Sequence, residues 1–248
     1  MKMRKFGEVI NKIEDLLFEP HACICCRREC DSDSSYRLCS RCQKVFPFIN
    51  GKYCLKCGEP IADDYDFCYN CQDSDFVFDR SRSVFAYDDM TRPIIMRFKY
   101  NGLKTYAKPL GKMLADYFGS SDLIADVATF VPMPEKRKKK RGYNQAEVLC
   151  DEFCKLTGMP MVDALKRVKD IPRQSTLSGK ERIENIKGNF AAADNSLVKD
   201  KSVLVIDDVV TTGATVNECA KALLKAGARE VMVLSLAKTV GENNKKLL

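Results

Sequence analysis

The chain has 248 residues, with 41 Lys and Arg against 34 Asp and Glu, so its formal charge is +7. This length suits one large domain, or a domain of about 150 residues with a smaller companion. No apolar run is long enough to cross a bilayer and no signal-peptide core follows Met1, which predicts a cytoplasmic protein with reduced cysteines. The positive charge is compatible with phosphorylated ligands or nucleic acid and establishes neither.

Apolar residues recur every three or four positions near the start of the chain. They predict an amphipathic helix over residues 5–18, within an N-terminal segment of residues 1–20. Lysines and an arginine flank this stripe, so two uses are open. Such a helix docks on its own protein, which is the commoner use, or rests on an anionic membrane surface.

Ten of the 13 cysteines lie between Cys23 and Cys71, which marks residues 21–75 as a region of separate chemistry. Eight of them form four C-x2-C pairs: Cys23/Cys26, Cys39/Cys42, Cys54/Cys57 and Cys68/Cys71. Two thiolates at this spacing grip one side of a tetrahedral ion, so four pairs predict two zinc ions. Four thiolates leave no open position on the metal. The zinc is therefore expected to be structural and to supply folding energy to a segment too polar to form its own core.

Two questions about the cysteine region stay open at the level of the sequence. Each pair can join its neighbour along the chain, or the pairs can interleave. An iron–sulfur cluster or redox-active thiols are alternatives, but the regular spacing of the pairs favours zinc. Cys25, Cys30 and the sole histidine, His21, are left over.

Residues 76–248 alternate strand-like and helix-like segments, which predicts an α/β domain with a mostly parallel sheet flanked by helices. Single strands are expected at residues 128–131, 203–206 and 231–237, and a strand pair at residues 76–87. Helices are expected at residues 107–118 and after Gly142, the second with a buried face of Ala146, Leu149, Cys150 and Phe153. Residues 165–190 are polar and irregular, which favours a loop with a short helix over the active-site face.

Six consecutive cations occupy residues 136–141, directly after the strand expected at residues 128–131. A run of like charge is usually a solvated, flexible loop. A mobile basic loop of this kind can also close over a pyrophosphate group and exclude water. The sequence leaves both interpretations in place.

The stretch KSVLVIDDVVTTGATVNECAK, residues 201–221, is the most informative part of the chain. A buried strand ends in Asp207 and Asp208, and a small turn then leads into a helix. Backbone N–H groups at a helix start lack partners and lie at the positive end of the helix dipole, so they bind a phosphate. The carboxylates would repel that anion, and they suit the hydroxyls of an attached polyol such as ribose. An ordinary turn with a threonine N-cap is the simpler alternative, and it leaves the acidic pair unexplained.

This stretch closely resembles the signature of type I phosphoribosyltransferases, which bind 5-phosphoribosyl-1-pyrophosphate (PRPP). The resemblance implies that Asp207 and Asp208 hold the ribose hydroxyls, and that the 5-phosphate is wrapped by Thr211, Thr212, Gly213, Ala214 and Thr215. Asp207 or Asp208 could also assist proton transfer, and nothing in the sequence chooses between them. Mg²⁺ is expected with PRPP, held chiefly by the pyrophosphate and ribose oxygens.

Three further stretches, MRFKYNG, VPMPEKRKKKRGYNQAE and LKRVKDIPRQSTLSGKERIENIKGNF, together with the cysteine pairs, resemble the ComF family of competence-associated proteins over nearly the whole chain. The resemblance implies a zinc-binding segment fused to a phosphoribosyltransferase domain, with a role in handling incoming single-stranded DNA. By position, loops at residues 98–100 and 137–143 would contact pyrophosphate, with Lys99 and Arg141 as the cations. No hood segment typical of purine or pyrimidine enzymes is recognisable, so the acceptor stays open.

Two functions follow. The first is a PRPP-dependent transferase in which Lys99 and Arg141 stabilise the charge that develops on the leaving pyrophosphate. The second is a non-catalytic adaptor that holds single-stranded DNA, meets DNA-uptake or recombination proteins, and keeps a vestigial or regulatory PRPP site. Release of pyrophosphate from PRPP would mark the transferase, and a steep loss of DNA affinity in salt would mark the adaptor.

Overall fold

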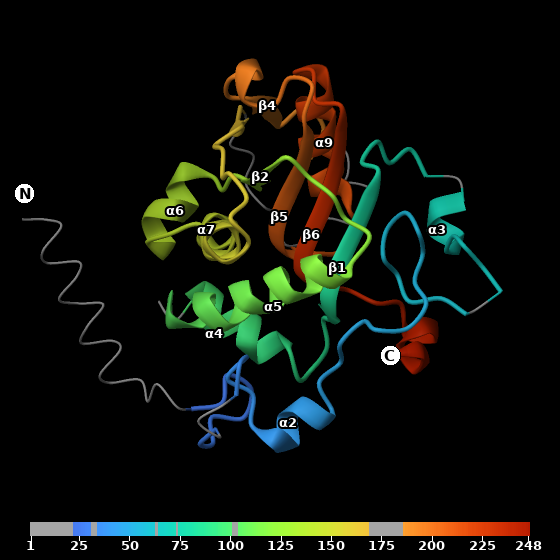
Figure 1. Ribbon diagram of the computed structural model, residues 1–248, viewed down its shortest axis with the longest axis vertical. Coiled ribbons are helices and arrows are strands. Elements are labelled where there is room, and N and C mark those ends of the chain that lie inside the picture. The colour runs from blue at the N-terminus through green and yellow to red at the C-terminus, as the bar shows by residue number, and fades with distance from the viewer. Residues whose placement is uncertain (1–21, 31–33, 63, 73, 101–103, 169–185) are drawn as a thin grey trace, which may run out of the picture.

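The computed structural model describes residues 22–30, 34–62, 64–72, 74–100, 104–168 and 186–248 (Figure 1). The amphipathic helix expected within residues 1–20 lies outside these residues, as does His21. None of the described helices is long and apolar enough to cross a bilayer.

A four-stranded parallel sheet forms the centre of the molecule. Its strands are β1 (Arg80–Ala86), β2 (Val127–Phe130), β5 (Ser202–Val210) and β6 (Glu230–Lys238), in the order β1-β6-β5-β2. Most residues of all four strands are buried, as expected when helices cover both faces of a parallel sheet. Met161 adds a parallel bridge to Ala128 of β2, which extends this edge of the sheet.

Helices lie on both faces of the sheet. The long helices are α5 (Ala107–Ser120), α7 (Gln145–Thr157) and α9 (Ala214–Lys225). Helices α5 and α7 pack together and cover one face. The β5–α9–β6 connection runs along the sheet in the opposite direction from β1–α5–β2, so right-handed crossovers place α9 on the other face. The predicted α/β architecture is therefore confirmed, including the buried side of α7 at Ala146, Leu149, Cys150 and Phe153.

Three local predictions differ from the structure. Residues 76–87 contain one strand, β1, and not a strand pair, because β1 pairs with the distant β6. The expected basic loop is a helix, α6 (Glu135–Arg141). The ends of residues 165–190 form a small antiparallel sheet of β3 (Leu165–Arg167) and β4 (Phe190–Ala192), and residues 169–185 lie outside the described chain.

The cysteine-rich region forms two lobes on the sheet domain (Figure 1). The first cysteine lobe, residues 22–30 and 34–49, contains α2 (Ser40–Lys44) and lies against α4 (Arg92–Tyr100). The second cysteine lobe, residues 52–62 and 64–72, contains α3 (Tyr69–Gln72) and lies beside β1. Three short 3-10 helices complete the described elements: η1 (Lys104–Tyr106), η2 (Asn195–Leu197) and η3 (Glu242–Leu247).

An arginine fastens each lobe to the sheet domain. Arg97 of α4 donates hydrogen bonds to the carbonyl oxygens of Ile24 and Cys25 in the first lobe, at 2.9 and 3.1 Å. Arg82 of β1 is fully buried and donates to the carbonyl oxygen of Leu55 in the second lobe at 3.0 Å. A charged donor on a backbone carbonyl makes one of the stronger hydrogen bonds in proteins, so both lobes are held by specific contacts.

The second lobe approaches β1 especially closely. The backbone N–H of Ser81 donates to the carbonyl oxygen of Lys56 at 2.8 Å. A Cβ added to Gly58 would lie 2.6 Å from the carbonyl oxygen of Ser81, a distance that only glycine permits. The second lobe and the first strand therefore pack backbone against backbone.

Candidate functional site

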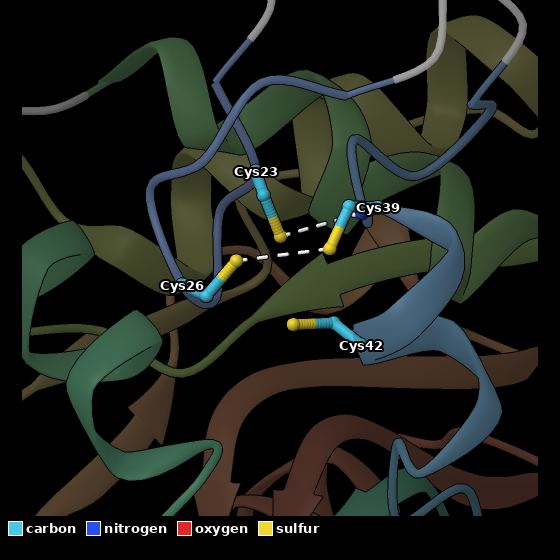
Figure 2. Close-up of side chains that lie close together, drawn as sticks. All are labelled: Cys23, Cys26, Cys39 and Cys42. Atoms are coloured by element: carbon cyan, nitrogen blue, oxygen red, sulfur yellow. Dashed lines mark hydrogen bonds between the residues drawn. The ribbon is translucent and has the colours of Figure 1, made fainter.

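The eight paired cysteines form two four-sulfur clusters. Cys23, Cys26, Cys39 and Cys42 make the first, with all four sulfur atoms within 4.8 Å of one another. Cys54, Cys57, Cys68 and Cys71 make the second at the same spacing. Figure 2 shows the first cluster, in which two cysteines on one loop face two at the start of α2. Neighbouring pairs therefore join, which resolves the pairing that the sequence left open.

The donor chemistry of both clusters fits structural zinc. Four sulfur ligands converge on one point in each, as a tetrahedral thiolate site requires. In the second cluster, the hydrogen bond between Cys57 and Cys54 lowers the pKa of Cys54 to about 4 and, together with burial, raises the pKa of Cys57. Seven of the eight cysteines are buried, so each shell is closed and suits a structural metal better than a catalytic one.

A cavity of about 590 Å³ lies at the carboxyl ends of the parallel strands. It is lined by residues in or just after three strands: Tyr87 after β1, Val131 after β2, and Asp207 in β5. After β2 the chain returns to the sheet at Met161, on the outer side of β2. After β5 it returns at β6, on the side of β5 away from β2. The space between β2 and β5 is therefore a topological switch point, where open α/β sheets bind their ligands.

One wall of the cavity comes from a single continuous stretch. Asp207 and Asp208 are near the end of β5, and the five residues of the predicted phosphate loop all line the cavity: Thr211, Thr212, Gly213, Ala214 and Thr215. Gly213 has a φ of 79° and caps α9, a helix of 12 residues whose N-terminus opens into the cavity. This wall therefore combines two carboxylates with an anion-binding helix start.

A second group of lining residues, the cationic wall, comes from separate elements. Lys99 and Arg141 both line the cavity, and Arg137 lies beside them one helical turn before Arg141. The Nζ atom of Lys99 is 2.8 Å from Oδ2 of Asp208, so this ion pair joins α4 to β5 beside the cavity. The family resemblance implied a pyrophosphate contact for Lys99 and a ribose contact for Asp208. In the structure these two side chains are in direct contact.

The positions of the cations differ from the expected loops. Lys99 lies in the last turn of α4, and Arg141 lies in the last turn of α6. The Arg141 guanidinium carbon lies 4.7 Å from the centre of the Tyr100 ring, and the same side chain donates to Oε1 of Gln145. The Tyr143 hydroxyl donates to the carbonyl oxygen of Phe98. These contacts tie α4 to α6 and the start of α7, so the cationic wall is built by tertiary packing.

Other residues at the cavity were missed by the sequence analysis. Arg167 of β3 lines it, and its guanidinium carbon lies 5.3 Å from the centre of the Phe190 ring on β4. Ile186 also lines the cavity. The only signal was the polar composition of residues 165–190, which placed this segment over the active-site face without identifying any side chain.

Comparisons with known proteins match both parts of the chain. A double zinc ribbon domain model matches residues 13–72, and a phosphoribosyl transferase domain model matches residues 139–246. Competence protein F of Haemophilus influenzae is 32% identical over 208 residues, which cover 81% of this chain and 90% of that protein.

Two other relatives extend the comparison. The DNA utilization protein YhgH of Escherichia coli is 27% identical over 91% of this chain and 100% of its own length. Competence protein ComFC of Bacillus subtilis is 25% identical over 83% of this chain and 89% of its own length. The chain therefore belongs to the ComF family, with a double zinc ribbon followed by a domain of the type I phosphoribosyltransferase fold.

Proposed function

We propose that the cavity binds PRPP together with Mg²⁺ and transfers its phosphoribosyl group to a nucleophile. One observation carries this proposal: a single cavity joins a helix N-terminus, two adjacent carboxylates and at least two cations. PRPP has the matching parts in one molecule, namely a 5-phosphate, a ribose with free hydroxyls and a pyrophosphate.

Each part of PRPP has a counterpart in the cavity. The N–H groups and hydroxyls of the loop from Thr211 to Thr215 suit the 5-phosphate. Asp207 and Asp208 accept hydrogen bonds from the ribose hydroxyls. Lys99 and Arg141 also line the cavity and suit the pyrophosphate.

The proposed reaction breaks the bond between C1 of the ribose and the pyrophosphate oxygen while the nucleophile bonds to C1. Positive charge develops on the ribose and negative charge on the pyrophosphate, which leaves with the bonding electron pair. Lys99 and Arg141 stabilise that negative charge. Asp207 or Asp208 takes the proton that the nucleophile loses. Mg²⁺ prefers hard oxygen ligands, which PRPP itself chiefly supplies, and it would neutralise part of the pyrophosphate charge.

The ion pair between Lys99 and Asp208 fits this arrangement. Their side chains are 21% and 13% exposed, so the pair is shielded from most of the solvent. It partly neutralises an acidic pair that would otherwise repel the incoming anion. An ammonium group has three donors, so Lys99 can hold Asp208 and a pyrophosphate oxygen together.

Pyrophosphate release tests the reaction. Purified protein is incubated with PRPP, Mg²⁺ and pools of amine, nucleobase and oligonucleotide acceptors, and pyrophosphate is measured. We expect release above the rate of spontaneous PRPP decay in at least one pool, and loss of that release in Lys99→Met. If no pool gives release while PRPP still binds, the transferase proposal is wrong and the adaptor with a regulatory PRPP site replaces it.

We also propose that the outer side of α6 binds single-stranded DNA. Arg137 and Arg141 face the cavity, whereas Lys136, Lys139 and Lys140 are exposed. Lys138 pairs with Glu147 of α7 at 2.7 Å. The helix thus separates cavity-lining cations from solvent-facing ones, and an exposed cationic row suits a phosphate backbone.

The names of the relatives support a biological setting for both proposals. They refer to competence and DNA utilization, so we infer a role in competence, with DNA-uptake or recombination proteins as partners. The many reduced thiols of the two clusters suit the cytoplasm, where thiols are kept reduced.

A further inference from the structure

One aromatic side chain, Phe76, lies between the second cysteine lobe and the phosphate loop. Phe76 packs against the buried cluster of the second lobe, which consists of Cys54, Cys57, Ile61, Cys68 and Cys71. The same ring covers the start of α9, because a Cβ added to Gly213 would lie 3.2 Å from its Cζ atom. Phe76 therefore contacts both the metal-binding cluster and the glycine at the centre of the phosphate loop.

Neighbouring contacts hold this ring in place. Phe76 stacks on Phe78, with ring centres 4.9 Å apart, and Phe78 is buried. Between them, the backbone N–H of Val77 donates to Oδ1 of Asn217 at 2.7 Å. Asn217 lies in the first turn of α9 and is buried, and its own N–H donates to the carbonyl oxygen of Gly213 at 2.9 Å. Residues 76–78 are thus bonded to the same helix start that the ring covers.

We infer that the second cysteine lobe sets the conformation of the phosphate loop, with Phe76 as the positioning residue. Gly213 adopts a left-handed conformation, in which glycine has more freedom than other residues, so a side chain packed against it restricts the backbone of the loop. Phe76 supplies that contact while it packs on the second lobe, whose own order depends on its four sulfur ligands. Loss of metal from the second cluster therefore loosens the loop. The three atoms nearest to a Cβ built at Gly213 all belong to Phe76, and none belongs to the first cluster.

Hydrogen exchange of the free protein tests this coupling without any ligand. The reporter amides are Val77 and Asn217, which are protected by the hydrogen bonds described above. In Phe76→Ala we expect both to exchange roughly tenfold faster, as in a local opening, while amides of β6 keep their wild-type rates. Phe76→Leu, which keeps apolar bulk, should recover part of the protection. Wild-type rates at both amides in Phe76→Ala would overturn the inference.

Phe48→Ala is the matched control. Phe48 is also a partly buried aromatic, but it packs on Phe46 in the first lobe, with ring centres 4.7 Å apart. It should leave the rates at Val77 and Asn217 unchanged. Equal acceleration by both variants would show a general loss of stability and would contradict a specific path through Phe76.

A metal comparison adds a second arm. Cys57→Ser and Cys42→Ser each remove one ligand, from the second and first cluster respectively. With zinc content measured for each, only Cys57→Ser should speed exchange at Val77 and Asn217. If Cys57→Ser does not stay folded, the Phe76 variants decide the question. Acceleration by Cys42→Ser alone would overturn the inference.

The consequence for ligand binding rests on the proposed PRPP site. Titration of PRPP with Mg²⁺ should show Phe76→Ala binding roughly tenfold more weakly than wild type, which corresponds to about 1.4 kcal/mol. If the wild-type protein does not bind PRPP, the proposed function fails and the exchange result still stands. If wild type and Phe76→Ala bind equally, the coupling to the ligand fails and the proposed function stands.

Discussion

The two cysteine lobes have the same ligand set and different neighbours. The first lobe contacts α4, whose last turn carries Lys99. The second lobe contacts β1 and, through Phe76, the start of α9. One lobe therefore contacts the helix that carries Lys99, and the other contacts the glycine before α9 through Phe76.

This difference indicates why a family of phosphoribosyltransferase-like proteins carries a double zinc ribbon. The cavity walls end in short turns and helix termini, which are the least constrained parts of an α/β domain. Each lobe adds contacts behind one of these termini. We infer that the lobes act as supports for the cavity as well as independent metal sites, and the following predictions test each support.

Metal removal should have the largest effect. Purified protein is expected to carry two zinc ions per chain, one in each four-sulfur cluster. A strong chelator should unfold both lobes before the sheet domain, because metal binding supplies much of their folding energy. Elemental analysis and circular dichroism check this. Absence of zinc, or visible absorption from iron and sulfide, would contradict it.

Asp122→Ala should have the next largest effect, on the support from the second lobe. Asp122 pairs with the buried Arg82 at 2.7 Å, and Arg82 in turn holds Leu55. Removal of the Asp122 carboxylate leaves the buried Arg82 guanidinium unpaired, which should lower the free energy of unfolding by about 2–3 kcal/mol. This loss is smaller than for a fully buried pair because Asp122 is partly exposed. The control is Asp151→Ala, which breaks an exposed pair with Lys155 and should cost under about 0.5 kcal/mol.

The same pair gives a pH dependence. Burial raises the pKa of Asp122, but hydrogen bonding and charge from Arg82 lower it overall. A lowered pKa in the folded state means that the pair stabilises at neutral pH and that this contribution is lost as the pH falls below about 5. Wild-type protein should lose more stability than Asp122→Ala over that range. Equal losses in urea-unfolding curves of the two proteins would disagree with this explanation.

Arg97→Met should produce a smaller effect, on the support from the first lobe. The variant keeps the aliphatic stem of the side chain and removes the donors to Ile24 and Cys25. We expect a loss of about 1.5–2 kcal/mol, at the lower end for hydrogen bonds from charged groups because Arg97 is only half-buried. Hydrogen exchange at residues 22–30 should accelerate. The exposed Arg92 on the same helix provides the control Arg92→Met, which should leave both measurements unchanged.

The smallest effect is expected on the outer side of α6. Lys139→Gln combined with Lys140→Gln should reduce the salt dependence of single-stranded DNA binding by about 0.7 in logarithmic slope for each lost phosphate contact. Arg141→Ala should weaken PRPP binding and leave that slope unchanged. Oligonucleotide titrations at several salt concentrations measure both slopes. A double lysine variant with the wild-type slope would remove DNA from the proposed role of α6.

The cavity also shows which sites a sequence can predict. The cavity wall from Asp207 to Thr215 is one continuous strand, turn and helix, so local pattern alone could predict that these residues lie together. The cationic wall is assembled from α4 and α6, whose approach depends on contacts such as Tyr143 with Phe98. Lys99 and Arg141 were therefore identified only by family resemblance, and their helices were expected as loops. Arg167 was missed because its place depends on the pairing of β3 with β4.

The two metal clusters show the same limit. The spacing of the cysteines predicted eight ligands and two sites, because a C-x2-C turn is a local structure. The sequence did not show which pairs join, because both sequential and interleaved pairing satisfy the spacing. It also did not show how each lobe contacts the sheet domain, because Arg82 and Arg97 lie outside the cysteine region. The contacts of Arg82, Arg97 and Phe76 with the lobes depend on the tertiary fold and have no local sequence pattern.

Calorimetric titration of PRPP with Mg²⁺ tests the central claim most directly, because it asks whether the supported cavity binds the proposed ligand. Wild-type protein should bind one PRPP per chain. Asp207→Asn combined with Asp208→Asn should weaken binding by at least about a hundredfold, because two charge-assisted contacts with the ribose are lost. The melting temperature of the variant shows that it is folded. Wild-type protein that gives no binding heat, or a folded double variant with unchanged affinity, would contradict the account.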